Sequence, residues 1–297
     1  MSRHSKPSIS IIGAGRLGAA LAIALRRSGY PIVGLVARHH RKAEKVARLL
    51  TQDAGETAPL AIASNESKRL PSSDLILIST PDDEIAGVAQ KLSRETHGSI
   101  VFHTSGALSS EVLAPLKTRG ISTGSIHPLI SVSEAKAGAE AFQGAFFCIE
   151  GDNKALRTAR RIVSDLGGTA FSIPSHNKAL YHAAAVIASP HATSLFDVAV
   201  QTLVAAGLTR NKARQVLVPL LQSTVRNLET SDAASALTGT FARGDVATVK
   251  RHLKALSGRE HSQALQIYKL LGLHALRLAQ MNGLDRKLTK EITKLLS

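Results

Sequence analysis

The sequence is poor in cysteine and in aromatic residues. Among its 297 residues it has one cysteine, Cys148, and no tryptophan, and aromatic residues make up only 3%. A single cysteine excludes a disulfide within the chain and suits a reducing compartment, so we expect a cytoplasmic protein. With so few rings, leucine, alanine, isoleucine and valine must fill the core.

Long apolar runs are also missing. The first residues, MSRHSKPS, lack the apolar segment of a signal peptide, and no uninterrupted apolar run reaches the roughly 18 residues of a transmembrane helix. We therefore expect no membrane association. Hydrophobic residues make up 44% and charged residues 20% of the chain, which is typical of globular proteins, and the length is comfortable for two domains.

Acidic residues are few. The chain has 22 of them against 37 lysines and arginines, a net charge of +15. Such a charge can favour nucleic acid, but the basic residues are scattered, and no aromatic-rich basic face accompanies them. We expect a solvated basic surface that also attracts an anionic cofactor or substrate, and no nucleic-acid partner. Zinc-ligand spacing and a Gly-x-Ser-x-Gly elbow are both missing, so no metal site or hydrolase is indicated.

Strand-like and helix-like segments alternate in the first part of the chain. Short apolar segments, expected as buried strands, occupy residues 8–13, 31–37, 74–80, 98–104 and 122–128, and a strand–helix–strand unit follows over 144–174. The segments between them predict helices over residues 16–28, 40–52, 83–93, 109–119 and about 154–166. This alternation predicts an α/β domain with a doubly wound, mostly parallel sheet over residues 1–174.

Strand signals stop after Pro174. Apolar residues then recur every three or four positions and predict helices over residues 178–206, 211–228, 245–257, 259–281 and 285–296. We therefore expect an all-α second domain over residues 175–297. Long apolar helices need partners, so this domain is a candidate for homodimerisation.

A glycine-rich loop joins the first strand to the first helix. Its residues are Gly13, Ala14, Gly15, Arg16, Leu17 and Gly18. A Gly-x-Gly-x-x-Gly pattern between a strand and a helix is typical of dinucleotide binding. Gly13 allows the tight turn, Gly15 lets the backbone approach a pyrophosphate, and Gly18 lets helix and strand pack closely. The alternative, a glycine-rich turn without a ligand, fits this context less well.

The end of the second strand indicates the phosphorylated cofactor. NAD enzymes usually place a carboxylate there for the ribose 2′-hydroxyl, whereas this chain has Arg38, then Arg41 and Lys42, and no carboxylate before Glu44. Because guanidinium groups bind phosphate in a bidentate manner, we predict NADP(H), with Arg38 at the 2′-phosphate. Lys42 and Arg41 also fit a solvated helix face.

Polar residues follow three further strands, at what would be the carboxyl edge of the sheet. Thr80, Pro81 and Ser105 are the predicted cofactor contacts there. Asp82 and Asp83 are interpreted as helix N-caps. The next two strands end at His103 and His127, and two histidines at one edge suggest a substrate cleft, with His127 as a substrate-binding residue.

Lys178 and His182 stand four residues apart in the stretch NKALYHAAAV, and hence on one face of a helix. An ammonium or imidazolium near a carbonyl stabilises and protonates the alkoxide that forms during hydride transfer. The alternative is that Lys178 reaches toward solvent and His182 pairs with a backbone group. The residues alone favour neither.

A second constellation is LTGTFARGD, residues 237–245. Arg243 could clamp a substrate carboxylate, and Asn227, one helix earlier, could add an amide. Asp245 could cap the following helix, and a local ion pair of Arg243 with Asp245 is the alternative.

Taken together, these motifs resemble the bacterial Rossmann-like proteins that carry domain of unknown function 2520 (DUF2520). The matching segments are IIGAGRLG, STPDDEI, FHTSGALSSEVL, GSIHPLISV, KALYHAAAVIAS and ALTGTFARGDVATVKRHLKAL. Thr240 stands where that pattern has proline, and Pro190 where it has asparagine. The family is similar to ketopantoate reductase, 3-hydroxyisobutyrate dehydrogenase, pyrroline-carboxylate reductase and F420-dependent NADP reductase, and to the 6-phosphogluconate dehydrogenase-like C-terminal superfamily.

The resemblance implies a Rossmann domain followed by a helical, often dimerising, domain. In the keto-acid and hydroxyacid relatives, Lys-x-x-x-Asn on the first long helix of the second domain faces the nicotinamide, and Lys178 and His182 match that place. It implies that Lys178 and His182 are catalytic in an NADP-dependent reductase of a small anionic carbonyl compound, such as ketopantoate, or of an imine. The alternative from another class is a non-catalytic NADP(H)-binding sensor or scaffold.

Overall fold

The computed structural model describes residues 6–51, 57–95 and 100–297. The chain divides into two compact units, Met1–Ala188 and Ser189–Ser297. Gln52, the predicted end of the second helix, and Gly98 and Ser99, the predicted start of the fourth strand, lie outside the described residues.

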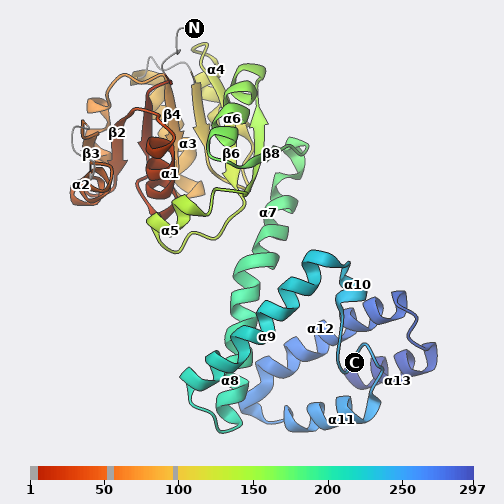
Figure 1. The fold of residues 1–297 in the computed structure, drawn as a ribbon. Helices are drawn as coiled ribbons and strands as arrows, with labels where there is room; N and C mark the ends of the chain where they lie inside the picture. Colours follow the sequence, from red (N-terminus) through yellow and green to blue (C-terminus); the bar gives the residue numbers. More distant parts are fainter. Residues whose placement is uncertain (1–5, 52–56, 96–99) are drawn as a thin grey trace. The chain divides into compact units, whose positions relative to one another are not determined.

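The first unit is built on one sheet with the strand order β3-β2-β1-β4-β5-β6-β7-β8 (Figure 1). The strands are β1 Ile9–Ile12, β2 Ile32–Ala37, β3 Leu60–Ala63, β4 Leu75–Ile78, β5 Ile100–His103, β6 Ser122–Pro128, β7 Phe146–Gly151 and β8 Thr169–Phe171. All neighbours are parallel except β6 and β7. The predicted doubly wound, mostly parallel sheet is therefore confirmed, with β3 as an additional edge strand.

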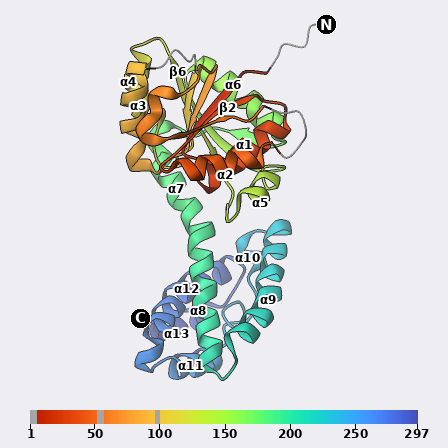
Figure 2. The same ribbon diagram turned by 90° about the vertical axis from the view of Figure 1, so that its left-hand side faces the viewer.

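Helices cover both faces of this sheet, because its central strands carry apolar side chains on both faces. On β4, Leu75 and Leu77 enter the core under α1, α2, α5 and α6, whereas Ile76 and Ile78 enter the core under α3 and α4. Figure 2 shows α3 and α4 on one side of the strands and α1 and α2 on the other. The helices are α1 Arg16–Arg27, α2 His40–Leu49, α3 Asp82–Glu95, α4 Ala114–Lys117, α5 Ala135–Glu140 and α6 Asn153–Asp165.

A long helical stretch follows the last strand. It runs from a single 3-10 turn through α7 (Lys178–Val186) and a π-helical turn (Ile187–His191) into α8 (Ala192–Ala205). Pro190, which cannot donate a backbone hydrogen bond, lies inside the π-turn. By length and mean hydropathy alone, Ser175–Ala205 is long and apolar enough to cross a membrane. It contains no uninterrupted apolar run of that length, because Lys178, His182 and Asp197 interrupt it.

The second unit is entirely helical in its described residues, which confirms the predicted all-α region. Besides α8 it contains α9 Arg210–Thr230, α10 Ala233–Ala236, α11 Val246–Ala255, α12 Ser262–Met281 and α13 Arg286–Leu296. Its core lies among α11, α12 and α13, where Val249, Leu276 and Ile292 are buried. In contrast, Ala213 is the only fully buried residue of the long helix α9.

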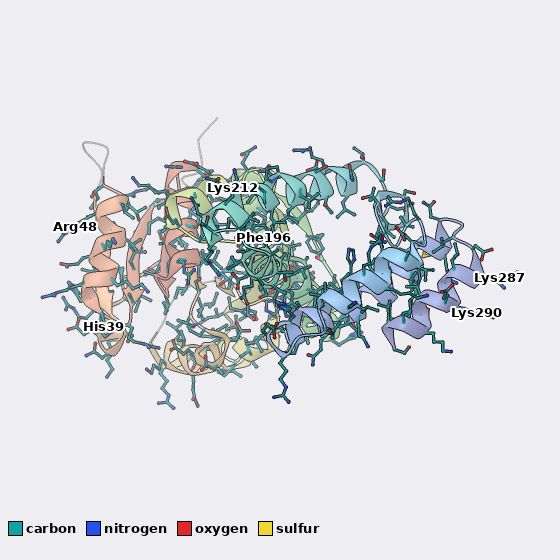
Figure 3. The ribbon with its side chains drawn as sticks, turned by 90° about the horizontal axis from the view of Figure 1, so that it is seen from below. His39, Arg48, Phe196, Lys212, Lys287 and Lys290 are labelled. Atoms are coloured by element: carbon teal, nitrogen blue, oxygen red, sulfur yellow. The ribbon has the colours of Figure 1, made fainter. Side chains whose placement is uncertain are left out.

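Basic side chains occur on both units. Arg48 on α2, Lys212 on α9, and Lys287 and Lys290 on α13 all extend outward from their helices in Figure 3. The charge is therefore spread over several helices, as the sequence analysis expected.

Candidate functional site

The turn from β1 into α1 requires two of its three glycines for packing reasons. Gly13 has φ +102°, and a Cβ there would lie 2.5 Å from the backbone carbonyl of Ser79. A Cβ on Gly18 would lie 2.1 Å from the Gly13 oxygen. Both positions accept only glycine because the helix and two strands meet there.

Gly15 differs, because nothing in the described residues requires it to be glycine. Its φ of −75° and ψ of −162° suit any residue, and the nearest atom to a Cβ would be the Gly13 oxygen at 4.0 Å. Gly15 is the N-cap of α1 and makes no side-chain capping bond, so the first backbone N–H groups of the helix are available to an anion. The missing side chain leaves room for a bound group.

A cavity of about 990 Å³ opens over this loop. It lies at the carboxyl ends of the strands, next to the point between β1 and β4 where the strand order reverses, and this is where open α/β sheets bind ligands. The cavity is lined by all the predicted cofactor contacts except Gly18, namely Gly13, Ala14, Gly15, Arg16, Leu17, Arg38, Thr80, Pro81 and Ser105. The predicted residues thus come together in one place.

Arg38 lies at the β2 end of the cavity and is mostly exposed. Its Nη2 donates to Oε1 of Glu84 on α3 at 2.8 Å, and both side chains line the cavity. His39 and Lys42 line the same end. Glu84 could not be recognised from the sequence, because its pairing with Arg38 joins residues 46 positions apart.

The Ser105 side chain is fixed by three hydrogen bonds. Its hydroxyl donates to Oδ2 of Asp82 at 2.8 Å and accepts from the backbone N–H groups of Ala107 and Leu108. The interpretation of Asp82 as a simple N-cap was therefore incomplete: α3 begins at Asp82 itself, and its carboxylate holds the loop after β5.

Lys178 is buried, with 1% of its surface exposed, and is not among the cavity-lining residues. Its ammonium donates to the Ser125 hydroxyl at 2.9 Å and to the Ser105 carbonyl at 3.3 Å. Burial lowers the pKa of Lys178, and nearby Cys148, Glu150 and Asp82 oppose this shift. The alternative in which Lys178 reaches toward solvent is wrong, and its direct contact with a substrate stays a prediction.

His127, on β6, and His182, on α7, also line the cavity, beside Gly106. A Cβ on Gly106 would lie 2.6 Å from Nδ1 of His182 and 2.8 Å from Nε2 of His127. The two rings meet edge to face with centroids 5.7 Å apart. Gly106 therefore makes room for both imidazoles, a role that the sequence analysis did not assign.

Burial sets the charge of this histidine group. Desolvation, helped by the positive charge of Lys178, lowers the pKa of His127 to about 4, and the same two causes lower the pKa of buried His103 to about 4. Both rings are therefore neutral at pH 7. His127 also pairs with Tyr181, whose hydroxyl lies 2.7 Å from Nδ1.

Asn227 and Arg243 belong to the second unit, where both are exposed. Asp245 is the N-cap of α11, as predicted, and accepts from the Thr248 N–H at 2.9 Å and the Thr248 hydroxyl at 2.7 Å. The roles of Asn227 and Arg243 toward a substrate stay predictions.

Two family models match the sequence. A Rossmann-like domain matches residues 2–128, and DUF2520, a domain of unknown function, matches residues 145–275. The chain carries a Rossmann-like domain followed by a DUF2520 domain. No curated protein matches the sequence.

Solved structures of the same fold are found among reductases. A candidate NADP oxidoreductase from Bacteroides fragilis is 23% identical, with a TM-score of 0.76 over 92% of this chain and 99% of the other. A protein from Thermotoga maritima is 24% identical, with a TM-score of 0.70 over 92% and 99%. Plasmodium falciparum pyrroline carboxylate reductase with NADP bound is 12% identical, with a TM-score of 0.59 over 99% of each chain. At these identities the likeness shows a shared fold.

Proposed function

We propose that this DUF2520 protein is an NADP(H)-dependent oxidoreductase that reduces a small, anionic carbonyl compound, such as a 2-keto acid like ketopantoate, or an imine. The observation that carries the proposal is the open space at Gly15, since neither packing nor backbone conformation explains that glycine. The relatives named as an NADP oxidoreductase and as a pyrroline carboxylate reductase support the same activity.

The lining of the cavity fits this cofactor. The backbone N–H groups of the first turn of α1 would hold the pyrophosphate beside Gly15, whose own N–H donates to the Gly13 carbonyl at 2.7 Å, and Arg38 would hold the 2′-phosphate. Thr80, Pro81 and Ser105 would then flank the nicotinamide ribose. When bound, NADPH supplies the hydride.

The histidine end of the cavity would handle the substrate. His127 and His182 lie beside Gly106 with ring nitrogens that can donate to an oxygen or nitrogen acquiring negative charge. Lys178 lies behind them, bonded to the Ser105 carbonyl, so we assign it a positioning and electrostatic role in the catalytic group. Arg243 and Asn227 are proposed to orient the substrate carboxylate.

A screen of NADPH oxidation against 2-keto acids, aldehydes and cyclic imines tests the function. The wild-type protein should oxidise NADPH with at least one compound class, and Lys178→Met should reduce kcat at least about 100-fold while the Kd for NADPH changes less than about twofold. NADPH binding without turnover on any compound, together with normal cellular function of Lys178→Met, would favour the sensor instead.

We also propose that the protein is a cytoplasmic homodimer that pairs through its helical unit. Within this unit, apolar side chains remain exposed along α9 and α12, with Leu220 at 63% and Leu270 at 70%. A helix as long as α9 that buries almost nothing lacks the packing that stabilises helices in water. A second copy of the same apolar helices would supply it.

Sedimentation measures this pairing directly. The wild-type protein should have twice the 31.4 kDa mass of the chain, and Leu220→Glu should shift it toward the monomer, because a buried unpaired carboxylate is costly. Leu60→Glu, at a leucine exposed to 43% on β3, is the matched control and should remain dimeric. A monomeric wild type at micromolar concentration would contradict the proposal.

A further inference from the structure

We propose that Tyr181 fixes the neutral tautomer of His127 that carries its hydrogen on Nε2, so that His127 offers an N–H donor to the reacting oxygen or nitrogen of the substrate. The inference about the substrate rests on the proposed function, whereas the inference about the tautomer rests on the geometry and the burial of the two residues. Tyr181 is then a positioning residue, acting through His127.

The direction of the hydrogen bond between the two residues follows from their chemistry. The Tyr181 hydroxyl lies 2.7 Å from His127 Nδ1, and the two rings meet edge to face. Burial raises the pKa of Tyr181 and lowers that of His127 to about 4, so a protonated phenol faces a neutral imidazole. A phenol is a good donor and a weak acceptor, and an unprotonated imidazole nitrogen is a good acceptor. Tyr181 therefore donates to Nδ1, which leaves the ring hydrogen on Nε2.

Packing holds the tyrosine in this position. The Tyr181 ring contacts Phe171 of β8 edge to face, with centroids 5.9 Å apart, and it also contacts His127 at 5.6 Å. These two ring contacts restrict the orientation of the phenol whose hydroxyl lies next to Nδ1.

His127 and His182 both line the cavity, where they pack against Gly106. Nε2 lies 2.8 Å from the point that a Gly106 Cβ would occupy, and His182 Nδ1 lies 2.6 Å from the same point. Among the described residues, His182 Nδ1 is buried without a hydrogen-bond partner. A ring nitrogen of β6 and one of α7 therefore lie close together against Gly106, on residues that line the cavity.

The surroundings of His127 fit a neutral donor. Burial, together with the ammonium of Lys178, disfavours a positive charge on this ring. A neutral imidazole polarises a carbonyl or imine by donating a hydrogen bond from its N–H group. A nearby ammonium strengthens that polarisation. Protonation of the product would then come from His182 or from water.

Nuclear magnetic resonance of ¹⁵N-labelled histidine tests the tautomer directly at pH 7, with the His127 signals assigned by their loss in His127→Asn. In the wild-type protein, His127 should show a protonated Nε2 and an unprotonated, hydrogen-bonded Nδ1. In Tyr181→Phe, the Nδ1 signal should lose its hydrogen-bond shift, and the Nδ1–H tautomer should become populated. A wild-type ring protonated at Nδ1, or an unchanged His127 in Tyr181→Phe, would overturn the proposal.

The chain offers a matched control in its second unit. The Tyr268 hydroxyl lies 2.9 Å from His252 Nδ1, and these rings also meet edge to face, but His252 is exposed. Tyr268→Phe should change the His252 signals and leave His127 unaffected.

Steady-state kinetics test whether the tautomer of His127 matters for the proposed reaction. With a substrate from the NADPH screen, Tyr181→Phe should lower kcat about tenfold and leave the KM for NADPH unchanged. An unchanged kcat would overturn the catalytic part of the proposal. If the tautomer is as stated but no compound is reduced, the reductase function fails while the role of Tyr181 in holding His127 stands.

Discussion

Replacing Gly15 with alanine is expected to leave the fold intact and to weaken NADPH binding at least about 30-fold. The φ and ψ of Gly15 are open to alanine, and its methyl group would meet no atom of the described protein closer than 4.0 Å. The same methyl group would stand where the backbone approaches the pyrophosphate, and a loss of about 2 kcal/mol of binding corresponds to this factor. Calorimetric titration with NADPH, beside a thermal unfolding curve, measures both quantities.

Gly13→Ala is the contrasting variant. Gly13 needs its positive φ, and its methyl group would collide with the Ser79 carbonyl, so this substitution should lower the unfolding temperature as well as the affinity. The two glycines therefore separate a requirement of the ligand from a requirement of the fold. If Gly15→Ala bound NADPH as well as the wild type, the assignment of this loop to a dinucleotide would be wrong.

Most of the first unit was predictable because its signals are local. The apolar runs of β1, β2 and β4 are short and are each followed by a helical segment, and the glycine loop has a fixed spacing. The edge strand β3 was missed, since LAIA is short, half exposed and poor in β-branched residues. The antiparallel direction of β7 could not be predicted from the sequence either. The direction of a strand depends on the length and path of the connection before it and not on the strand's own residues.

The candidate site was only partly predictable, for the same reason. Backbone spacing places Lys178 and His182 on one helix face, but it cannot say that Lys178 turns inward to Ser125 while His182 reaches the cavity. The partners of these groups come from distant segments: Tyr181 and His127 are 54 residues apart. A tyrosine in an alanine-rich helix reads as ordinary packing until its histidine partner is seen.

Removing the guanidinium of Arg38 should cost NADPH binding about 30-fold and change NADH binding less than about twofold. The expected reason is that a charge-assisted, bidentate contact to the 2′-phosphate is lost, and NADH has no group at that position. Fluorescence titration of Arg38→Ala with each dinucleotide measures the selectivity. An equal loss for both dinucleotides would contradict the assignment of Arg38 to the 2′-phosphate.

Glu84 allows a second test of Arg38, because its Oε1 accepts a hydrogen bond from Arg38 Nη2 at 2.8 Å. Binding of the phosphate must compete with that exposed ion pair, so Glu84→Gln should tighten NADPH binding about threefold.

Combining Glu84→Gln with Arg38→Ala shows how Glu84 weakens NADPH binding. If Glu84 acts by engaging Arg38, its effect should vanish in Arg38→Ala; if the carboxylate repels the phosphate through space, the effect should persist there. Glu44→Gln, which removes a carboxylate that pairs with His40 on α2, is the control for a general change of charge. A threefold gain in that variant too would mean that the field of the whole surface, and not the Arg38–Glu84 pair, sets the affinity.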